Sequence, residues 1–250
     1  MDREIKGGST AGQDDNSMDR ELQHKIRRHL ADFVTERRKQ RIEEVLARRT
    51  RYLTVVAENL YQPHNASAVI RTCDCFGVQD LHVIEHNNRF EINDSVAVGS
   101  GKWVTVRRHV DPEGNATKRC LQDLKDRGYR IAALTLQESA EPLKNVSLDQ
   151  KLALCLGTEE EGLSETAHEL SDLFVQLPMH GFNQSFNVSV TGALALYELI
   201  GRLHTLDLDW HLTEEEKDDL RYDWYCKTVP EAELHVARVK AAERRNRSGC

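Results

Sequence analysis

The chain has 250 residues, of which 39% are hydrophobic and 30% charged, as in an ordinary soluble globular protein. No apolar run approaches the roughly 20 residues that span a bilayer, so we expect no membrane association. Residues 1–18 lack the apolar segment of a secretory signal, and we expect them to form a disordered tail. The cysteines are therefore expected to be reduced thiols of a cytoplasmic protein. Cys73 and Cys75 are spaced C-x-C, but without a second Cys/His pair at zinc spacing, so no metal site is expected.

The charge is unevenly distributed, although its net value of −7 argues against binding to a nucleic acid. Residues 19–51 hold eleven Lys/Arg against six Asp/Glu, and residues 234–250 hold five against one, whereas the stretch between is acidic. Basic ends on an acidic body predict that a polyanion is held by the extensions. The alternative is that these are solvated helical faces with no ligand.

The first half of the chain alternates between helical and strand patterns. Two short amphipathic helices are predicted within 19–48, followed by an apolar, β-branched strand at 53–57. A helix over 66–76 is framed by Asn65 as its N-cap and Gly77 at its end, and a strand at 81–84 follows. Strand, helix and strand with short links are the unit of a parallel sheet.

The second half repeats this alternation. We predict a helix at 116–127 ended by Gly128, strands at 129–135, 152–156 and 173–177, a short helix at 164–171 capped by Ser164, a helix at 188–203, and further helices within 207–245. The pattern predicts an α/β fold with a mostly parallel sheet, helices on both faces, and a ligand beyond the carboxyl ends of the strands. The loops after Leu134, Leu156 and Leu177 meet that description. Neither a G-x-G-x-x-G turn after the first strand nor a P-loop motif occurs, which disfavours a nucleotide-binding oxidoreductase or NTPase.

Three segments carry the most specific signal: residues 65–72 (NASAVIRT), 156–163 (LGTEEEGL) and 177–189 (LPMHGFNQSFNVS). In order and spacing they resemble the three signature motifs of the SPOUT methyltransferases, most closely the SpoU/TrmH branch, and the resemblance covers about residues 45–205. It implies an α/β domain with a C-terminal trefoil knot, S-adenosylmethionine as cofactor, and 2′-O-ribose methylation of RNA. Within the family, the resemblance favours a guanosine in the tRNA D-loop as the target. It also implies a homodimer in which one subunit's arginine lies near the other's cofactor.

The resemblance assigns site residues and a domain plan. It places the cofactor against Thr135, Gly157, Gly162, Leu177, Met179 and Phe186, and the catalytic centre at Asn65, Arg71, Glu159, Ser185 and Asn187. The expected domains are the tail at 1–18, a basic helical RNA-binding extension at 19–50, the SPOUT domain at 51–205 and a C-terminal helical extension at 206–250. No metal is expected, because the thioether leaving group needs no protonation.

Each site residue also has a plainer interpretation. An arginine within an apolar helix is costly to bury without an anion, so Arg71 is either an orienting group for the ribose and its phosphate or half of a structural salt bridge. A guanidinium titrates above about 12, which disfavours a role as base. The asparagines and Ser185 could be helix caps, Glu159 a solvated side chain, and the two glycines turn residues.

Two other functions remain open at this point. An rRNA ribose methyltransferase would carry the same motifs, because the motifs report chemistry and not the target; the basic extensions favour tRNA. A non-catalytic RNA-binding protein with the same fold is disfavoured by the intact catalytic set.

Overall fold

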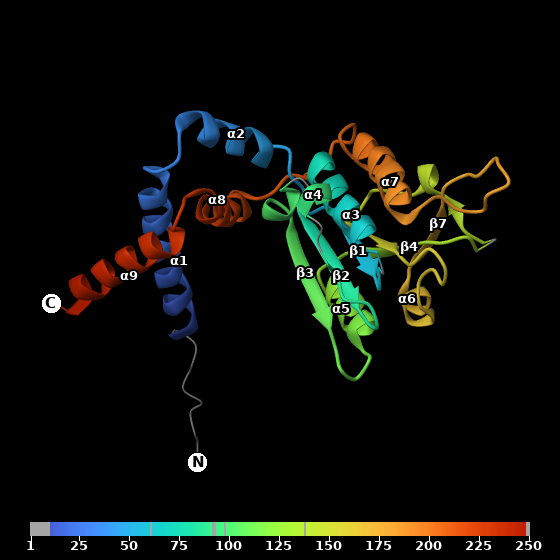
Figure 1. Cartoon of the computed structure of the whole chain (residues 1–250), viewed down its shortest axis with the longest axis horizontal. Coiled ribbons are helices and arrows are strands. Elements are labelled where there is room, and N and C mark those ends of the chain that lie inside the picture. The colour runs from blue at the N-terminus through green and yellow to red at the C-terminus, as the bar shows by residue number, and fades with distance from the viewer. Residues whose placement is uncertain (1–10, 61, 92–93, 98, 138, 249–250) are drawn as a thin grey trace, which may run out of the picture. The chain divides into compact units, whose positions relative to one another are not determined.

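The computed structural model describes residues 11–248 except 61, 92–93, 98 and 138. The chain divides into two compact units. One spans Ala47–Leu212, and the other joins the chain up to Leu46 to the chain from Thr213 (Figure 1). The two extensions predicted as separate domains thus belong to one unit.

The larger unit is built on a parallel sheet. Its strands are β1 (Leu53–Glu58), β2 (Asp80–Glu85), β3 (Thr105–Val110), β4 (Arg130–Leu134), β5 (Glu141–Pro142), β6 (Leu152–Leu156) and β7 (Leu173–Gln176), in the order β3-β2-β1-β6-β4-β7-β5. Each of the six pairings between these strands is parallel. The predicted α/β class is confirmed. The central strands are buried on both faces, which is why they read as continuous apolar runs.

Helices cover both faces of the sheet, as predicted. α3 (Pro63–Phe76) and α7 (Val188–Leu203) pack on one face, where their apolar residues join one buried cluster, and α5 (Ala116–Asp126) and α6 (Glu165–Leu170) pack on the other (Figure 1). Short elements complete the unit: α4 (Asp94–Ala97) and the 3₁₀ turns η1 (Ser100–Lys102) and η2 (Leu143–Asn145).

The ends of the helices correct one prediction and confirm two. α3 begins at Pro63 with Gln62 as its N-cap residue, so Asn65 lies inside the first turn and is not the cap. Gly77 ends α3 with a φ of 76°, and a Cβ there would lie 2.5 Å from the carbonyl oxygen of Arg48, so only glycine fits. Ser164 caps α6 by accepting a hydrogen bond from the amide of Ala167 at 3.1 Å.

The smaller unit consists of α1 (Ala11–Ala31), α2 (Glu36–Leu46), α8 (Glu214–Thr228) and α9 (Ala232–Ser248). α1 begins at Ala11, so the later part of the predicted tail is helical, and residues 1–10 lie outside the described residues. None of the helices in the described part of the chain is both long and apolar enough to cross a membrane.

Acidic and basic side chains join the helices of this smaller unit. Arg221 of α8 donates to both carboxylate oxygens of Glu43 at 2.7 Å, and Lys25 of α1 lies 2.8 Å from Glu243 of α9. Arg27 pairs with Asp218 of α8. Part of the basic charge predicted to bind a polyanion is therefore used inside the unit.

Candidate active site

A cavity of about 420 Å³ opens where β4, β6 and β7 end, a volume suited to a small-molecule ligand. The three loops predicted to hold a ligand line it, because the carboxyl ends of parallel strands meet at one edge of the sheet. Its lining includes all six residues predicted to bind the cofactor, Thr135, Gly157, Gly162, Leu177, Met179 and Phe186, together with Glu159 and Ser185.

The loop after β6 folds back on itself at this cavity. The amide of Thr158 donates to the carbonyl of Gly162 at 2.9 Å, and the amide of Gly162 donates to the carbonyl of Thr158 at 3.1 Å. Gly162 has a φ of 72°, and a Cβ on Gly157 would lie 2.1 Å from the carbonyl carbon of Gly162. Such contact is impossible, so Gly157 is required by the close approach of two backbone segments, beyond any role in a turn.

Three of the five predicted catalytic residues form one hydrogen-bonded cluster. The side-chain amide of Asn187 donates to Oδ1 of Asn65 at 3.1 Å and to Oε1 of Glu159. The amide of Asn65 also donates to Oε1 of Glu159, at 3.4 Å. Asn187 is in addition the N-cap of α7, since its Oδ1 accepts from the amide of Ser189 at 3.0 Å. The two roles of Asn187 are compatible, because the cap hydrogen bond fixes the side chain that reaches Glu159.

A second cavity, of about 320 Å³, adjoins the first. Five amide side chains line it, those of Asn59, Gln62, Asn65, Asn87 and Asn88, together with the carboxylates of Glu159, Glu160 and Glu161. The two cavities share Glu159 among their lining residues, so the Asn65–Glu159–Asn187 cluster lies where they meet. The amides offer both donors and acceptors, which suits the hydroxyl and carbonyl groups of a polar ligand, and the carboxylates add further acceptors.

Arg71 lies apart from this cluster. It is exposed on α3, while Ala66, Ile70 and Cys73 of the same helix are buried in the core, and it lines neither cavity. The cost of burying a cation does not arise, because Arg71 falls on the outer face of α3. Among the described residues it makes no salt bridge, so the alternative of a structural ion pair finds no support.

The sequence analysis missed Glu58. This residue holds the end of the loop after β6 in place at Ser164. This carboxylate, 2% exposed, accepts hydrogen bonds from the amide and the hydroxyl of Ser164 at 2.8 and 2.7 Å, and from the hydroxyl of Thr117. Buried charge of this kind needs such partners. A carboxylate at the end of an otherwise apolar strand is the signal that could have revealed it.

His168 of α6 is the second missed residue. Its Nδ1 lies 3.0 Å from the carbonyl of Ser164, and its Nε2 lies 3.3 Å from the hydroxyl of Thr135 across the cavity. It thereby joins the loop after β4 to the cap of α6. An isolated histidine in a short helix gave no indication of this position.

Comparison with known proteins identifies the family. The sequence profile described as the SpoU rRNA Methylase family matches residues 52–197. A tRNA (guanosine(18)-2'-O)-methyltransferase of Borreliella burgdorferi is 40% identical over 200 residues, which cover 80% of this chain and 89% of that protein. One from Thermus thermophilus is 40% identical over 164 residues, 66% and 82% of the two chains. The crystal structure of the Aquifex aeolicus TrmH/SpoU tRNA modifying enzyme aligns with a TM-score of 0.70 and 32% identity, over 78% of this chain and 98% of that one. The chain therefore belongs to the SpoU methylase family.

Proposed function

We propose that the protein transfers a methyl group from S-adenosylmethionine to the 2′-hydroxyl of a guanosine in the tRNA D-loop, at position 18. The carrying observation is the pair of adjoining cavities that meet at the Asn65–Glu159–Asn187 cluster. The shared name of the relatives supports the choice of nucleotide, and the 40% identity of the Borreliella burgdorferi enzyme extends over 80% of this chain. Because its substrate is tRNA, the protein works in the cytoplasm.

The larger cavity is assigned to S-adenosylmethionine, whose sulfonium supplies an electrophilic methyl group. Gly157 and Gly162 have no side chains, so the cofactor can approach their backbone closely. Its apolar parts pack against Leu177, Met179 and Phe186. Glu159 is the carboxylate of the cluster and offers an acceptor at the meeting point of the cavities. The trefoil knot expected from the family resemblance stays a prediction.

The amide-lined cavity is assigned to the target nucleotide. There the amides of Asn65 and its neighbours hold the ribose so that its 2′-oxygen faces the methyl carbon, which contributes through proximity and alignment. The oxygen forms the new C–O bond as the C–S bond breaks, and the sulfur keeps the electron pair as a neutral thioether. The hydroxyl proton is lost to solvent, and a phosphate of the RNA assists its removal. No metal is part of this scheme.

A homodimer completes the site in this proposal. α7 exposes an apolar stripe at Val190, Leu194 and Tyr197, spaced i, i+4 and i+7, and large exposed stripes of this kind mark protein interfaces. α3, which carries the exposed Arg71, packs beside α7. The family resemblance implies that pairing of two α7 helices brings Arg71 of one subunit near the methyl-transfer site of its partner.

Methyl transfer to a defined RNA tests the proposed reaction. With S-adenosylmethionine labelled in its methyl group, we expect the purified protein to label a tRNA transcript at the ribose of guanosine 18, and not a transcript with 2′-deoxyguanosine there. Nuclease mapping of the labelled nucleotide reads the position. Labelling of a 23S or 16S rRNA transcript in preference to tRNA would assign the rRNA alternative, and no transfer to either RNA would leave a binding protein.

We assign tRNA binding to the smaller unit, through basic side chains that its internal salt bridges leave available. Arg37 and Arg38 of α2 are exposed and make no salt bridge with any residue between 11 and 248 that the structure describes. Such side chains gain affinity by releasing counterions from phosphates.

Replacing both arginines by glutamine is expected to weaken tRNA binding and to lower the slope of log K against log salt by about one for each phosphate that is no longer neutralised. The matched control replaces Lys118 and Lys144, exposed on the larger unit, by glutamine, and should leave the slope unchanged. Filter binding over a salt series measures both. An equal slope in the two double variants would show that α2 does not contact the RNA.

A further inference from the structure

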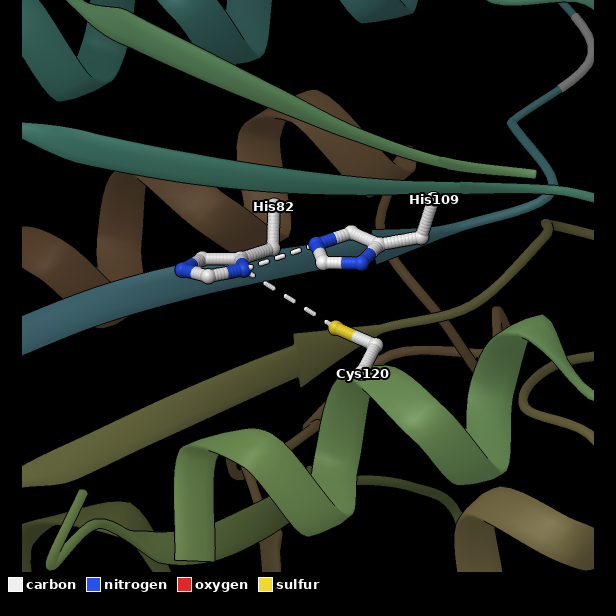
Figure 2. Close-up of side chains that lie close together, drawn as sticks. All are labelled: His82, His109 and Cys120. Atoms are coloured by element: carbon white, nitrogen blue, oxygen red, sulfur yellow. Dashed lines mark hydrogen bonds between the residues drawn. The ribbon is translucent and has the colours of Figure 1, made fainter. Parts of the chain in front are cut away.

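Two histidines and a cysteine from three separate elements meet on the face of the sheet that α5 covers. His82 lies on β2, His109 on the edge strand β3, and Cys120 on α5. His82 pairs with Arg107 in the β2–β3 register, so His109, two positions further along β3, is its diagonal neighbour on the same face. Figure 2 shows the two imidazoles side by side with the sulfur near them. We propose that these three side chains bind a zinc ion.

The separations of the donor atoms suit that ion. Nδ1 of His82 lies 3.0 Å from Nε2 of His109 and 3.9 Å from Sγ of Cys120, and all three atoms lie within 4.8 Å of one another (Figure 2). Zinc bound at about 2.0–2.1 Å to nitrogen and 2.3 Å to sulfur in a tetrahedron holds its nitrogens about 3.3 Å and its nitrogen and sulfur about 3.6 Å apart. The two observed separations therefore differ from these values by about 0.3 Å each.

The ligands are of the kind that zinc selects. Two imidazoles and a thiolate are softer than the oxygen ligands of Mg²⁺ or Ca²⁺. Burial first, and then the neighbouring His109, Arg107 and Arg127, lower the pKa of His82 to about 3. Burial also raises the pKa of Cys120 to about 12, so the ion must displace a proton from the thiol.

Acidic side chains compensate for the cations near the three ligands. Arg107 lies 3.7 Å from Asp80, and Arg127 lies 3.5 Å from Asp123, so each arginine has an acidic neighbour. Burial lowers the pKa of His109, and the charge of Asp123, one turn beyond Cys120 on α5, acts against that shift. Among the described residues no fourth His, Cys, Asp or Glu joins the three ligand atoms, so a water completes the tetrahedron.

The proposed ion is structural. None of its three ligands lines either cavity of the candidate active site, so the inference is independent of the proposed reaction. It ties β3, the edge strand of the sheet as far as the chain is described, to β2 and to the helix that covers both. The C-x-C pair of the sequence takes no part: Cys73 is buried and Cys75 exposed on α3, at the opposite face.

Cobalt is the probe for this site, because a Co²⁺–thiolate bond gives a charge-transfer absorption that oxygen and nitrogen ligands do not. The full chain, stripped with a chelator and titrated with Co²⁺, is expected to show this absorption at roughly one ion per chain and to lose it when Zn²⁺ is added. The Cys120→Ser and His109→Gln variants should bind Co²⁺ at least about tenfold more weakly, and Cys120→Ser should lack the sulfur band.

Cys73→Ser is the matched control, a buried cysteine in the core on the opposite face of the sheet, and it should keep the full absorption. Circular dichroism verifies that each variant is folded, and His109, only half-buried, gives a second variant should Cys120→Ser unfold. Zn²⁺ should also raise the melting temperature of the wild-type protein and not that of His109→Gln. A wild-type protein without the sulfur band, or equal bands in wild type and Cys120→Ser, would overturn the proposal in favour of a plain His82–His109 hydrogen bond.

Discussion

The Arg71→Ala variant is expected to lose about a hundredfold or more of the single-turnover methyl-transfer rate while its melting temperature stays close to that of the wild type. The stability should hold because Arg71 is exposed and forms no ion pair in the described part of the chain. The rate should fall because the proposed dimer brings this guanidinium to the partner's RNA. Arg71→Lys should also be slow, since a point charge does not reproduce a planar fork.

Mixed dimers distinguish whether Arg71 acts in the site of the partner subunit or in the site of its own subunit. A subunit with Arg71→Ala keeps its cluster, and a subunit with Asn187→Ala keeps its arginine, so their heterodimer has one complete site if Arg71 acts across the interface. We then expect mixing of the two inactive proteins to restore activity. Failure of mixing, with heterodimers verified by tandem affinity tags, would place Arg71 in its own subunit's site. A stable and fully active Arg71→Ala protein would remove it from the mechanism.

Gly157→Ala is expected to abolish cofactor binding. Its Cβ would lie 2.1 Å from the carbonyl carbon and 2.3 Å from the carbonyl oxygen of Gly162, both backbone atoms that no rotamer change can move. The loop would have to open, at a cost at or above about 1–3 kcal/mol, and the cavity it lines would change shape. Calorimetry with S-adenosylmethionine, in buffer without added zinc or magnesium, measures the loss.

Gly201→Ala is the control for that variant. Gly201 lies in α7, no described atom of its own chain surrounds the position of its Cβ within 4 Å, and alanine favours a helix over glycine by about 1 kcal/mol. Because Gly201 continues the exposed stripe of α7, size-exclusion chromatography is run beside calorimetry to verify that the variant keeps the wild-type oligomeric state. This variant should bind the cofactor as the wild type does and melt at the same or a higher temperature. Tight binding by Gly157→Ala would show that the cofactor does not depend on the folded-back loop.

The sequence predicted most of the parallel sheet because its central strands are apolar on both faces, and it missed β3 because an edge strand is not. Residues 105–110 (TVRRHV) include three basic or ionisable side chains, and only pairing with β2 makes them a strand. The strand order and the joining of both extensions in one unit depend on contacts between residues far apart in sequence, which no local pattern reports.

The site was predicted unevenly for a similar reason. The glycines and the Asn65–Glu159–Asn187 cluster carry their signal in motif spacing, and the cavity brings them together. The position of each residue on its helix was harder to predict. Asn65 lies one turn too far into α3 to cap it, and Arg71 lies on the outer face of α3. Glu58 and His168 act through loops that meet only in the folded unit, so a single strand or helix gives no indication of their partners.

The salt bridges of the smaller unit join segments that are synthesised far apart in time, and this separation sets an order for folding. Glu43 meets Arg221 across 178 positions of the chain, and Arg27 meets Asp218 across 191. On the ribosome, α1 and α2 therefore emerge long before the helices that complete their unit, while all seven strands of the sheet are made in between. The larger unit can therefore fold before α1 and α2 contact their partner helices α8 and α9. A nascent chain released before α8 would carry the candidate active site without the complete unit that we propose to bind tRNA.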